Sequence, residues 1–112
     1  STRRMLEQLV SDSGYQVKTA NDGVEAILVL KRWQPNIILS DLELPRLNGL
    51  ELTAHVRANP KLEDVPIIMI TYRYTEKHRE HAKKVGVNVY LTKPFSELDV
   101  LSNIEEMTRD TA

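Results

Sequence analysis

The feature that constrains this chain most is a series of short apolar runs separated by longer segments with helical periodicity. The runs 36–40 and 67–71 hold apolar residues at successive positions. Parallel strands that are covered on both faces have this composition. The run 15–19 alternates apolar and polar residues, and 87–92 is a further β-branched and aromatic run. Both of these also predict strands.

Apolar residues at helical spacing predict helices between and around these strands. Polar residues suited to N-caps precede several of the helices, and glycine or proline ends others. The predicted helices cover residues 2–13, 22–33, 49–58, 75–85 and 96–109. Helices that alternate with strands in this way form the outer layers of a sandwich around a parallel sheet. We therefore predict one three-layer α/β domain over residues 1–112.

Composition excludes several classes of function. The chain has no cysteine, which rules out a disulfide framework, a thiolate metal site and a cysteine nucleophile. Its formal net charge is −1, so no global field attracts nucleic acid or an anionic membrane. The apolar runs are far too short to span a bilayer, and no signal peptide is visible. We expect a cytoplasmic domain that binds neither nucleic acid nor membrane.

Three polar side chains stand where three of the predicted strands end. They are Asp41, Thr71 and Lys93. The carboxyl ends of parallel strands meet at one edge of a sheet, and binding sites form there. A carboxylate can attack phosphorus to form an acyl phosphate, a lysine can offset the phosphoryl charge, and a hydroxyl can donate a hydrogen bond. The combination predicts phosphoryl transfer to Asp41.

The residues around these three match a known family. Asp41 is followed at fixed spacing by Pro45 and Gly49 in the same loop. The further matches are Asn21-Asp22-Gly23 at the start of the second helix, Thr71, Tyr90, and the run Lys93-Pro94-Phe95. With these motifs, essentially the whole chain resembles the receiver domains of response regulators in two-component signalling.

The resemblance implies a flavodoxin-like fold with strand order 2-1-3-4-5 and a phosphoacceptor role for Asp41. The phosphoryl donor would be a histidine kinase or its phosphotransfer domain. Lys93 would offset the phosphoryl charge, and Thr71 would hydrogen-bond the phosphoryl group. Thr71 and Tyr90 would together form the switch that reads phosphorylation.

The resemblance also implies a Mg²⁺ ion held by Asp41 and the backbone carbonyl of Glu43, and a cis peptide bond before Pro94. Members of the family open with a central strand that ends in two acidic residues, whereas this sequence starts at the helix 2–13. We therefore expect the domain to be N-terminally incomplete as given, with weak or absent Mg²⁺ binding. Tyr72 stands where the family usually has a small residue, and we expect it to gate access to the site in part.

An output surface follows from the same resemblance. It would be the family's face of fourth helix, fifth strand and fifth helix, here 75–85, 87–92 and 96–109, presented to a downstream partner. The segments 3–6 and 75–84 look similar to receivers of chemotaxis-type hybrid histidine kinases, so such a kinase is the expected parent. A homodimer is a further option. Phosphotransfer and autodephosphorylation would be self-catalysed, and the domain would not be an enzyme in the usual sense.

Three alternative functions fit this sequence less well. A phosphohydrolase of the haloacid dehalogenase type needs a second aspartate where Glu43 stands. A flavodoxin-like nucleotide or flavin binder needs a phosphate loop after the first strand. A receiver that only binds partners would fit the absent acidic pair. His78 and His81 lie on a helix dense with charge, which favours a solvated face over a metal site.

Overall fold

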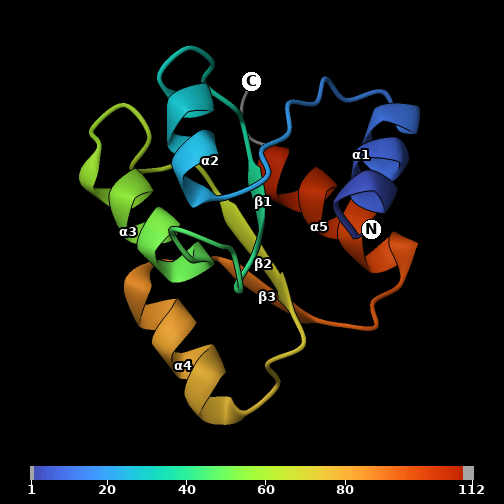
Figure 1. Ribbon diagram of the computed structural model, residues 1–112. Coiled ribbons are helices and arrows are strands. Elements are labelled where there is room, and N and C mark those ends of the chain that lie inside the picture. Colours follow the sequence, from blue (N-terminus) through green and yellow to red (C-terminus); the bar gives the residue numbers. More distant parts are fainter. Residues whose placement is uncertain (1, 110–112) are drawn as a thin grey trace.

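The computed structural model describes residues 2–109, which form an α/β sandwich (Figure 1). The elements are α1 (Thr2–Asp12), α2 (Gly23–Leu30), β1 (Ile38–Asp41), α3 (Gly49–Ala58), β2 (Ile67–Thr71), α4 (Glu76–Val85), β3 (Val89–Thr92) and α5 (Glu97–Thr108). All five predicted helices form, and so do three of the four predicted strands. Within residues 2–109, no helix has the length and apolar character to cross a membrane.

Polar caps start four of the helices where the sequence places them. The side chains of Asp22, Asn48, Thr75 and Ser96 each accept a backbone N–H from the first turn of α2, α3, α4 and α5, respectively. At α3 the Glu51 side chain also accepts the backbone N–H of Asn48, which completes a capping box. These bonds satisfy N–H groups that have no partner inside the helix, and so they fix where each helix begins.

The three strands form a parallel sheet in the order β1-β2-β3. The register pairs Asp41 with Ile70 and Thr71 with Thr92. The strands therefore end at nearly the same height, and the residues that follow them meet at one edge. This arrangement confirms the predicted α/β fold with a parallel sheet.

Side chains of β2 alternate between two cores on the two faces of the sheet. Ile67 and Met69 pack in one core with residues of α3 and α4. Ile68 and Ile70 pack in the other, which includes Val100 of α5 and residues of α1. Figure 1 shows the same division, with α2, α3 and α4 on one side of the sheet and α1 and α5 on the other. All five residues of β2 are buried, as the continuous apolar run predicts.

Residues 15–19 do not form the predicted strand. They have no ladder partner in the described chain, and the Tyr15 side chain is exposed. An extended segment becomes a strand only when a neighbour satisfies its backbone donors and acceptors. The alternation of apolar and polar residues indicates which face of the segment turns inward, but it does not supply the neighbour.

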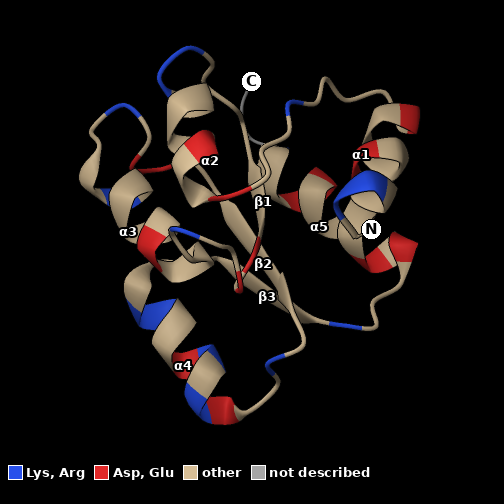
Figure 2. Ribbon diagram, in the orientation of Figure 1, with Lys and Arg blue, Asp and Glu red and all other residues tan. Residues whose placement is uncertain are grey.

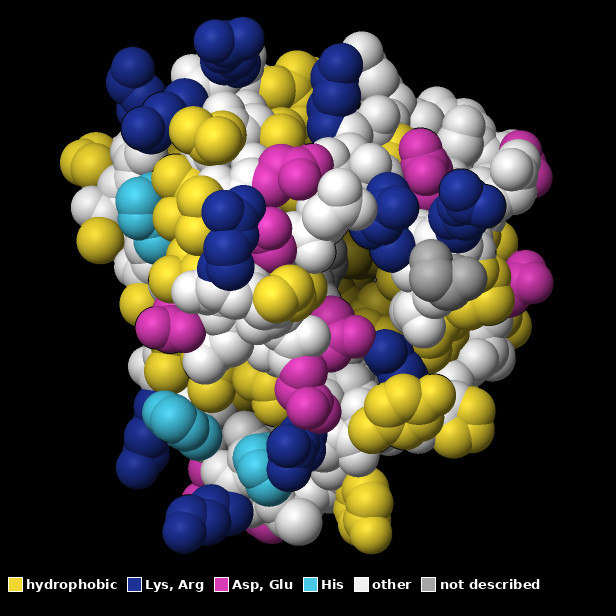
Figure 3. Space-filling view, viewed as in Figure 1, with side chains coloured by type: hydrophobic (Ala, Val, Ile, Leu, Met, Phe, Trp, Pro, Cys, Tyr) yellow, Lys and Arg dark blue, Asp and Glu magenta, His cyan; other side chains and the backbone are white. Residues whose placement is uncertain are grey.

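One edge of β1 has no strand beside it among residues 2–109. Three of the four residues of β1 are only half-buried, in contrast to fully buried β2. The apolar run 36–40 predicts a strand that is buried on both faces, and β1 is only partly buried. Figure 3 shows a hollow floored by hydrophobic side chains near the middle of the viewed face. An apolar strand with an unpaired edge favours pairing with a further strand.

Arg57, near the end of α3, ties together the loops at the amino ends of the strands. Its guanidinium donates to the backbone carbonyls of Glu63, Val65 and Gly86 and to Oδ1 of Asn88, over 2.8–3.1 Å. The same Asn88 oxygen accepts the first backbone N–H of β2 at 2.7 Å. No sequence pattern predicts this role of Arg57.

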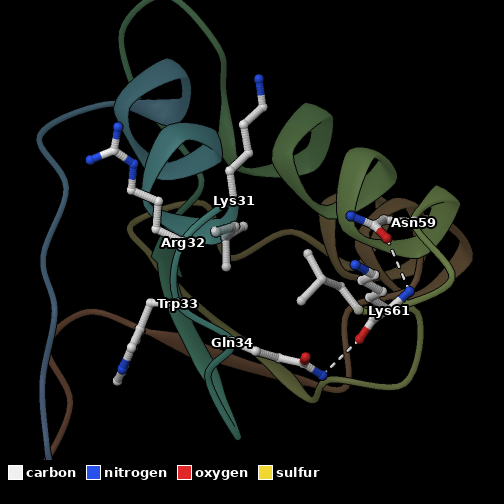
Figure 4. A pocket seen from close by; sticks show the side chains of 8 residues that line it. Lys31, Arg32, Trp33, Gln34, Asn59 and Lys61 are labelled. Carbon is white, nitrogen blue, oxygen red and sulfur yellow. Dashed lines mark hydrogen bonds between the residues drawn. The ribbon is translucent and has the colours of Figure 1, made fainter.

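We predict that Arg57→Met lowers the free energy of unfolding by about 2–4 kcal/mol, because three carbonyl oxygens lose a charged donor. The matched control is Arg32→Met. Arg32 is exposed, and in Figure 4 its side chain points away from Gln34 and Lys61. This control should change stability by less than about 0.5 kcal/mol. Urea denaturation measures both, and equal effects of the two substitutions would contradict the role of Arg57.

Candidate functional site

The structure brings Asp41 and Lys93 into direct contact at the carboxyl ends of the strands. Lys93 Nζ donates to Asp41 Oδ2 at 2.7 Å. The Lys93 side chain is only 9% exposed and that of Asp41 is 33% exposed, so this ion pair is largely withdrawn from water on the lysine side. The backbone N–H of Lys93 donates to the carbonyl of Thr71 at 2.7 Å, and the Lys93–Pro94 bond is cis.

The second carboxylate oxygen of Asp41 is also held. Oδ1 accepts the backbone N–H of Glu43 at 3.0 Å. The two contacts fix the plane of the carboxylate, and each oxygen keeps a lone pair for an incoming group. The arrangement is that of an oriented nucleophile whose negative charge is balanced by a neighbouring cation.

Close packing of two glycines shapes the loop 42–48 that follows Asp41. A Cβ on Gly49 would lie 2.3 Å from the carbonyl oxygen of Asp41, and one on Gly23 would lie 2.2 Å from that of Leu47. Both approaches are closer than any larger residue permits. Arg46 sits in the loop at φ 66° and binds Asp22, the cap of α2, at 2.8 Å. No sequence pattern predicts the Arg46–Asp22 contact.

Thr71 lies on the neighbouring strand and is fully buried. Its Oγ1 accepts the backbone N–H of Arg73 at 3.1 Å. The hydroxyl hydrogen is left to donate elsewhere. The structure thus brings Thr71 to the same edge as Asp41 and Lys93, with its oxygen engaged by the segment that leads to α4.

Tyr90 lies on β3 and links this strand to the same segment. Its hydroxyl donates to the carbonyl of Arg73 at 2.7 Å. The guanidinium of Arg79, on α4, lies 5.2 Å from the centre of the Tyr90 ring. Burial raises the pKa of the Tyr90 phenol. The family resemblance predicts a role for Tyr90, but no motif points to Arg73 or Arg79.

The side chain of Glu43 does not face Asp41 as a second acidic ligand. It forms an ion pair with Arg73, with Nε 3.1 Å from Oε1. Among residues 2–109, no group of three or more His, Cys, Asp or Glu side chains is arranged to hold a metal. Mg²⁺ prefers six oxygen ligands in near-octahedral geometry. The two ligands that the resemblance implies, the Asp41 carboxylate and the Glu43 carbonyl, would supply only part of such a set.

A second depression lies away from these strand ends. It is lined by Leu30, Lys31, Arg32, Trp33, Gln34, Asn59, Lys61 and Leu62. Figure 4 shows the Lys31 and Arg32 side chains pointing away from Gln34 and Lys61, so their cationic groups do not converge on one point. Gln34 Nε2 donates to the Lys61 carbonyl at 2.8 Å, which joins the end of α2 to the loop after α3. We interpret this depression as a place where the segment after α2 packs against the loop after α3, and not as a binding site.

Comparison with known proteins assigns the family. The family model described as "Response regulator receiver domain" matches residues 1–105. The chain belongs to the response regulator receiver family. It is 35% identical over 99% of its length to response regulator MprA of Mycobacterium leprae, of which it covers 48%. It is 38% identical over 97% of its length to the probable transcriptional regulator ycf27 of Porphyridium aerugineum, of which it covers 44%. The chain thus spans about half the length of these curated relatives.

Solved structures agree with this assignment. Chemotaxis protein CheY4 of Vibrio cholerae has a TM-score of 0.89 at 30% identity, over 95% of this chain and 88% of that one. The receiver domain of sensor histidine kinase PA1611 of Pseudomonas aeruginosa has a TM-score of 0.88 at 29% identity, over 97% and 89%. That second structure holds a magnesium ion in its active site cleft.

Membership in this family defines what the domain does at a coarse level. Receiver domains of response regulators and histidine kinases serve as phosphoacceptors in two-component signalling. They bind Mg²⁺ in the active site and interact with histidine kinases and downstream effectors. The chain is therefore a phosphoacceptor receiver domain.

The Asp22–Arg46 contact predicts that the stability of the fold depends on pH. The backbone N–H of Glu25 and the Arg46 guanidinium both favour the charged carboxylate, and the pKa of Asp22 is lowered. Between the folded and unfolded pKa values the unfolded state binds more protons, so stability falls as the pH drops through this window. We expect Asp22→Asn, which can still cap α2, to show a smaller loss of stability between pH 7 and about pH 3. Urea denaturation at both pH values measures this, and an unchanged pH dependence would contradict it.

Proposed function

We propose that Asp41 is the phosphoacceptor of this domain. The observation that carries the proposal is the 2.7 Å contact between Asp41 Oδ2 and a nearly buried Lys93 ammonium at the sheet edge. A carboxylate oriented by a backbone N–H and by a cation is ready to attack phosphorus without large rearrangement.

In the proposed reaction an Asp41 oxygen forms a bond to the phosphorus of a phosphohistidine donor. The P–N bond of the donor breaks, and its imidazole leaves with that electron pair. Charge develops on the phosphoryl oxygens, where the Lys93 ammonium offsets it. Thr71 donates its hydroxyl hydrogen to one of these oxygens. A histidine kinase or its phosphotransfer domain supplies the phosphoryl group.

The switch in this proposal consists of Thr71 and Tyr90, which both hydrogen-bond the backbone of Arg73. A change at the Thr71 hydroxyl therefore reaches the segment that leads into α4. The output face consists of α4, β3 and α5, and it meets the downstream partner. Ligand-driven change of this kind shifts the balance of two pre-existing conformations.

The proposal includes Mg²⁺, but the described residues supply only part of the ligand set that Mg²⁺ needs. Asp41 and the Glu43 carbonyl would each contribute one ligand, and bound Mg²⁺ would offset phosphoryl charge. The open edge of β1 is where a further parallel strand would fit, and its carboxyl end would lie next to Asp41. We propose that the intact domain has such a strand there, ending in acidic residues, and that residues 1–112 alone bind Mg²⁺ weakly.

The parent protein and its setting are also proposals. A chemotaxis-type hybrid histidine kinase is our preferred parent, supported by the likeness to a kinase receiver and to CheY4. We also propose that the protein lies in the cytoplasm and that it can form a homodimer. No nucleic acid contact is assigned to these residues.

We predict that Asp41→Asn abolishes phosphorylation by a small phosphodonor with Mg²⁺, because the amide cannot form the acyl phosphate. Intact-protein mass spectrometry measures the added phosphoryl group, which hydroxylamine should remove. The matched control is Glu43→Gln, which breaks only the exposed ion pair with Arg73 and should still accept the group. Equal labelling of the Asp41→Asn protein would contradict the assignment. If a form with a completed sheet stays unlabelled, a receiver that only binds partners becomes the better reading.

A second prediction tests the open edge. Preceding residues 1–112 with an apolar strand that ends in two acidic residues should raise both Mg²⁺ affinity and Tm. The strand would pair the free edge of β1, and the carboxylates would complete the oxygen ligands. The control is the same strand ending in two asparagines, which should raise the Tm with little gain in Mg²⁺ affinity. A Mg²⁺ titration and a thermal melt on all forms provide the readout, and equal values for short and extended forms would show the edge needs no strand.

A further inference from the structure

An ion pair joins the start of α2 to the loop 42–48 that follows Asp41. Arg46 Nε and Nη2 donate to Oδ2 of Asp22 at 3.0 and 2.8 Å. The other Asp22 oxygen, Oδ1, accepts the backbone N–H of Glu25 at 2.8 Å and caps α2. Figure 2 shows acidic and basic segments meeting where the loop after β1 passes the start of α2. A single carboxylate, with its side chain only 13% exposed, thus caps a helix and holds the loop.

The backbone at Arg46 is strained, and the ion pair acts on this point. The φ of Arg46 is 66°, which glycine adopts readily and other residues rarely do. Among residues 2–109, no other non-glycine residue has a positive φ. The backbone N–H of Leu47 donates to the Pro45 carbonyl at 2.7 Å, so Arg46 is the middle residue of a γ-turn. A γ-turn with positive φ is the rarer form and needs support from its surroundings, which the contact with Asp22 supplies.

Other contacts hold the rest of this loop. A Cβ on Gly23, the first residue of α2, would lie 2.2 Å from the carbonyl oxygen of Leu47, so the helix start and the loop are packed backbone to backbone. Leu44 and Leu47 pack against the core that β2 shares with α3 and α4. The backbone N–H of Gly49 donates to the Leu42 carbonyl at 2.8 Å and closes the base of the loop. The Arg46 ion pair is thus the polar part of a broader contact between α2 and the loop.

The near end of the same loop contacts the proposed phosphoacceptor. The backbone N–H of Glu43 donates to Asp41 Oδ1 at 3.0 Å, and the Glu43 carbonyl is the proposed Mg²⁺ ligand. Only Leu44 and Pro45 separate Glu43 from Arg46. The ring of Pro45 fixes its φ, so this short link is stiff. A displacement of Arg46 is therefore transmitted to Glu43 and changes how Glu43 meets Asp41.

We infer that Arg46 is a positioning residue, whose ion pair with Asp22 holds loop 42–48 so that the backbone of Glu43 is aligned with Asp41 before the phosphoryl donor arrives. This inference rests on the proposed phosphorylation of Asp41 and extends it to a contact that touches neither the donor nor Asp41. Loss of the ion pair lets the γ-turn relax and Glu43 move. Coordination to Mg²⁺ would hold the same Glu43 carbonyl, so Arg46 matters most when Mg²⁺ is scarce.

The experiment measures the rate of labelling by acetyl phosphate over a range of Mg²⁺ concentrations in the full-length protein. In this reaction an Asp41 oxygen bonds to the phosphorus, and acetate leaves. Arg46→Met keeps the backbone strain and loses the charge, whereas Arg46→Gly loses both. Each should raise the Mg²⁺ concentration for half-maximal rate about two- to fivefold, the factor that an ion pair with one exposed partner is worth. Saturating Mg²⁺ should restore the wild-type rate.

Further variants test whether the ion pair itself is responsible. Arg46→Lys keeps the charge and should show a smaller shift than Arg46→Met. Asp22→Asn can still cap α2 but loses the ion pair, so it should match Arg46→Met. The two substitutions together should shift the Mg²⁺ dependence little more than either alone, because both remove one contact. Arg32→Met is the matched control, since it removes an exposed arginine just after α2, and it should leave the Mg²⁺ dependence unchanged.

Amide hydrogen exchange without Mg²⁺ separates positioning from general stability. The amides of Glu43 and Gly49, which hold the two ends of the loop, should exchange faster in Arg46→Met and Arg46→Gly than in the wild-type protein. The amides of β2 lie in the core and report global opening, so they should accelerate less. If the β2 amides accelerate as much as those of Glu43 and Gly49, the ion pair only stabilises the fold, and the inference is wrong.

The labelling results distinguish failure of this inference from failure of the proposed function. If Arg46→Met keeps the wild-type Mg²⁺ dependence, or if Arg32→Met shifts it equally, the inference is wrong while Asp41 phosphorylation stands. If Arg46→Met shifts it and Arg46→Gly does not, backbone strain and not the ion pair is responsible, and the inference is again wrong. If the wild-type protein takes no label, the proposed function and this inference both fail.

Discussion

The complete burial of β2 is the constraint on which the site depends. Ile67 and Met69 fill one core, and Ile68 and Ile70 fill the other. A shift of one residue would exchange the two sets of side chains between cores, so the register of this strand is strongly determined. That register sets the height at which Thr71 ends the strand. Because β1 and β3 pair directly with β2, it also sets where Asp41 and Lys93 meet.

In the proposed function, the Asp41–Lys93 pair contributes more to chemistry than to folding. Withdrawal of an ammonium from water carries a desolvation cost that a single ion pair only partly offsets. The strand ends nevertheless hold Lys93 at 9% exposure, with its charge aimed at Asp41. A cation fixed in a poorly solvated place interacts strongly with charge that develops during a reaction, and it needs little reorganisation. If Asp41 is the phosphoacceptor, as proposed, the cost in stability and the capacity for phosphoryl transfer therefore have the same cause.

The sequence predicts the meeting of Asp41, Thr71 and Lys93 because each marks the change from an apolar strand to a polar loop. It does not predict that 15–19 stays unpaired, since alternation of residue types indicates a face and not a neighbour. The Arg57 network was missed because all its acceptors but Asn88 Oδ1 are backbone carbonyls, which carry no sequence signal. The contact between the Tyr72 ring and the Lys93 ammonium, which lies 4.9 Å from the ring centre, depends on the direction of the side chain just after a strand ends. Neither periodicity nor a motif encodes this direction.

The backbone of Arg73 joins the proposed chemistry to the output face. Its N–H is bound by the Thr71 hydroxyl oxygen, and its carbonyl is bound by the Tyr90 hydroxyl. If Thr71 turns its hydroxyl toward a phosphoryl group, the Arg73 N–H loses its acceptor while the carbonyl keeps its donor. The segment before α4 then keeps the hydrogen bond from Tyr90, whose ring also contacts Arg79 of α4, and the exposed ion pair between Arg73 and Glu43. In the proposed function, phosphorylation at Asp41 would therefore weaken the link between this segment and Thr71 and leave its link to β3 and α4 in place.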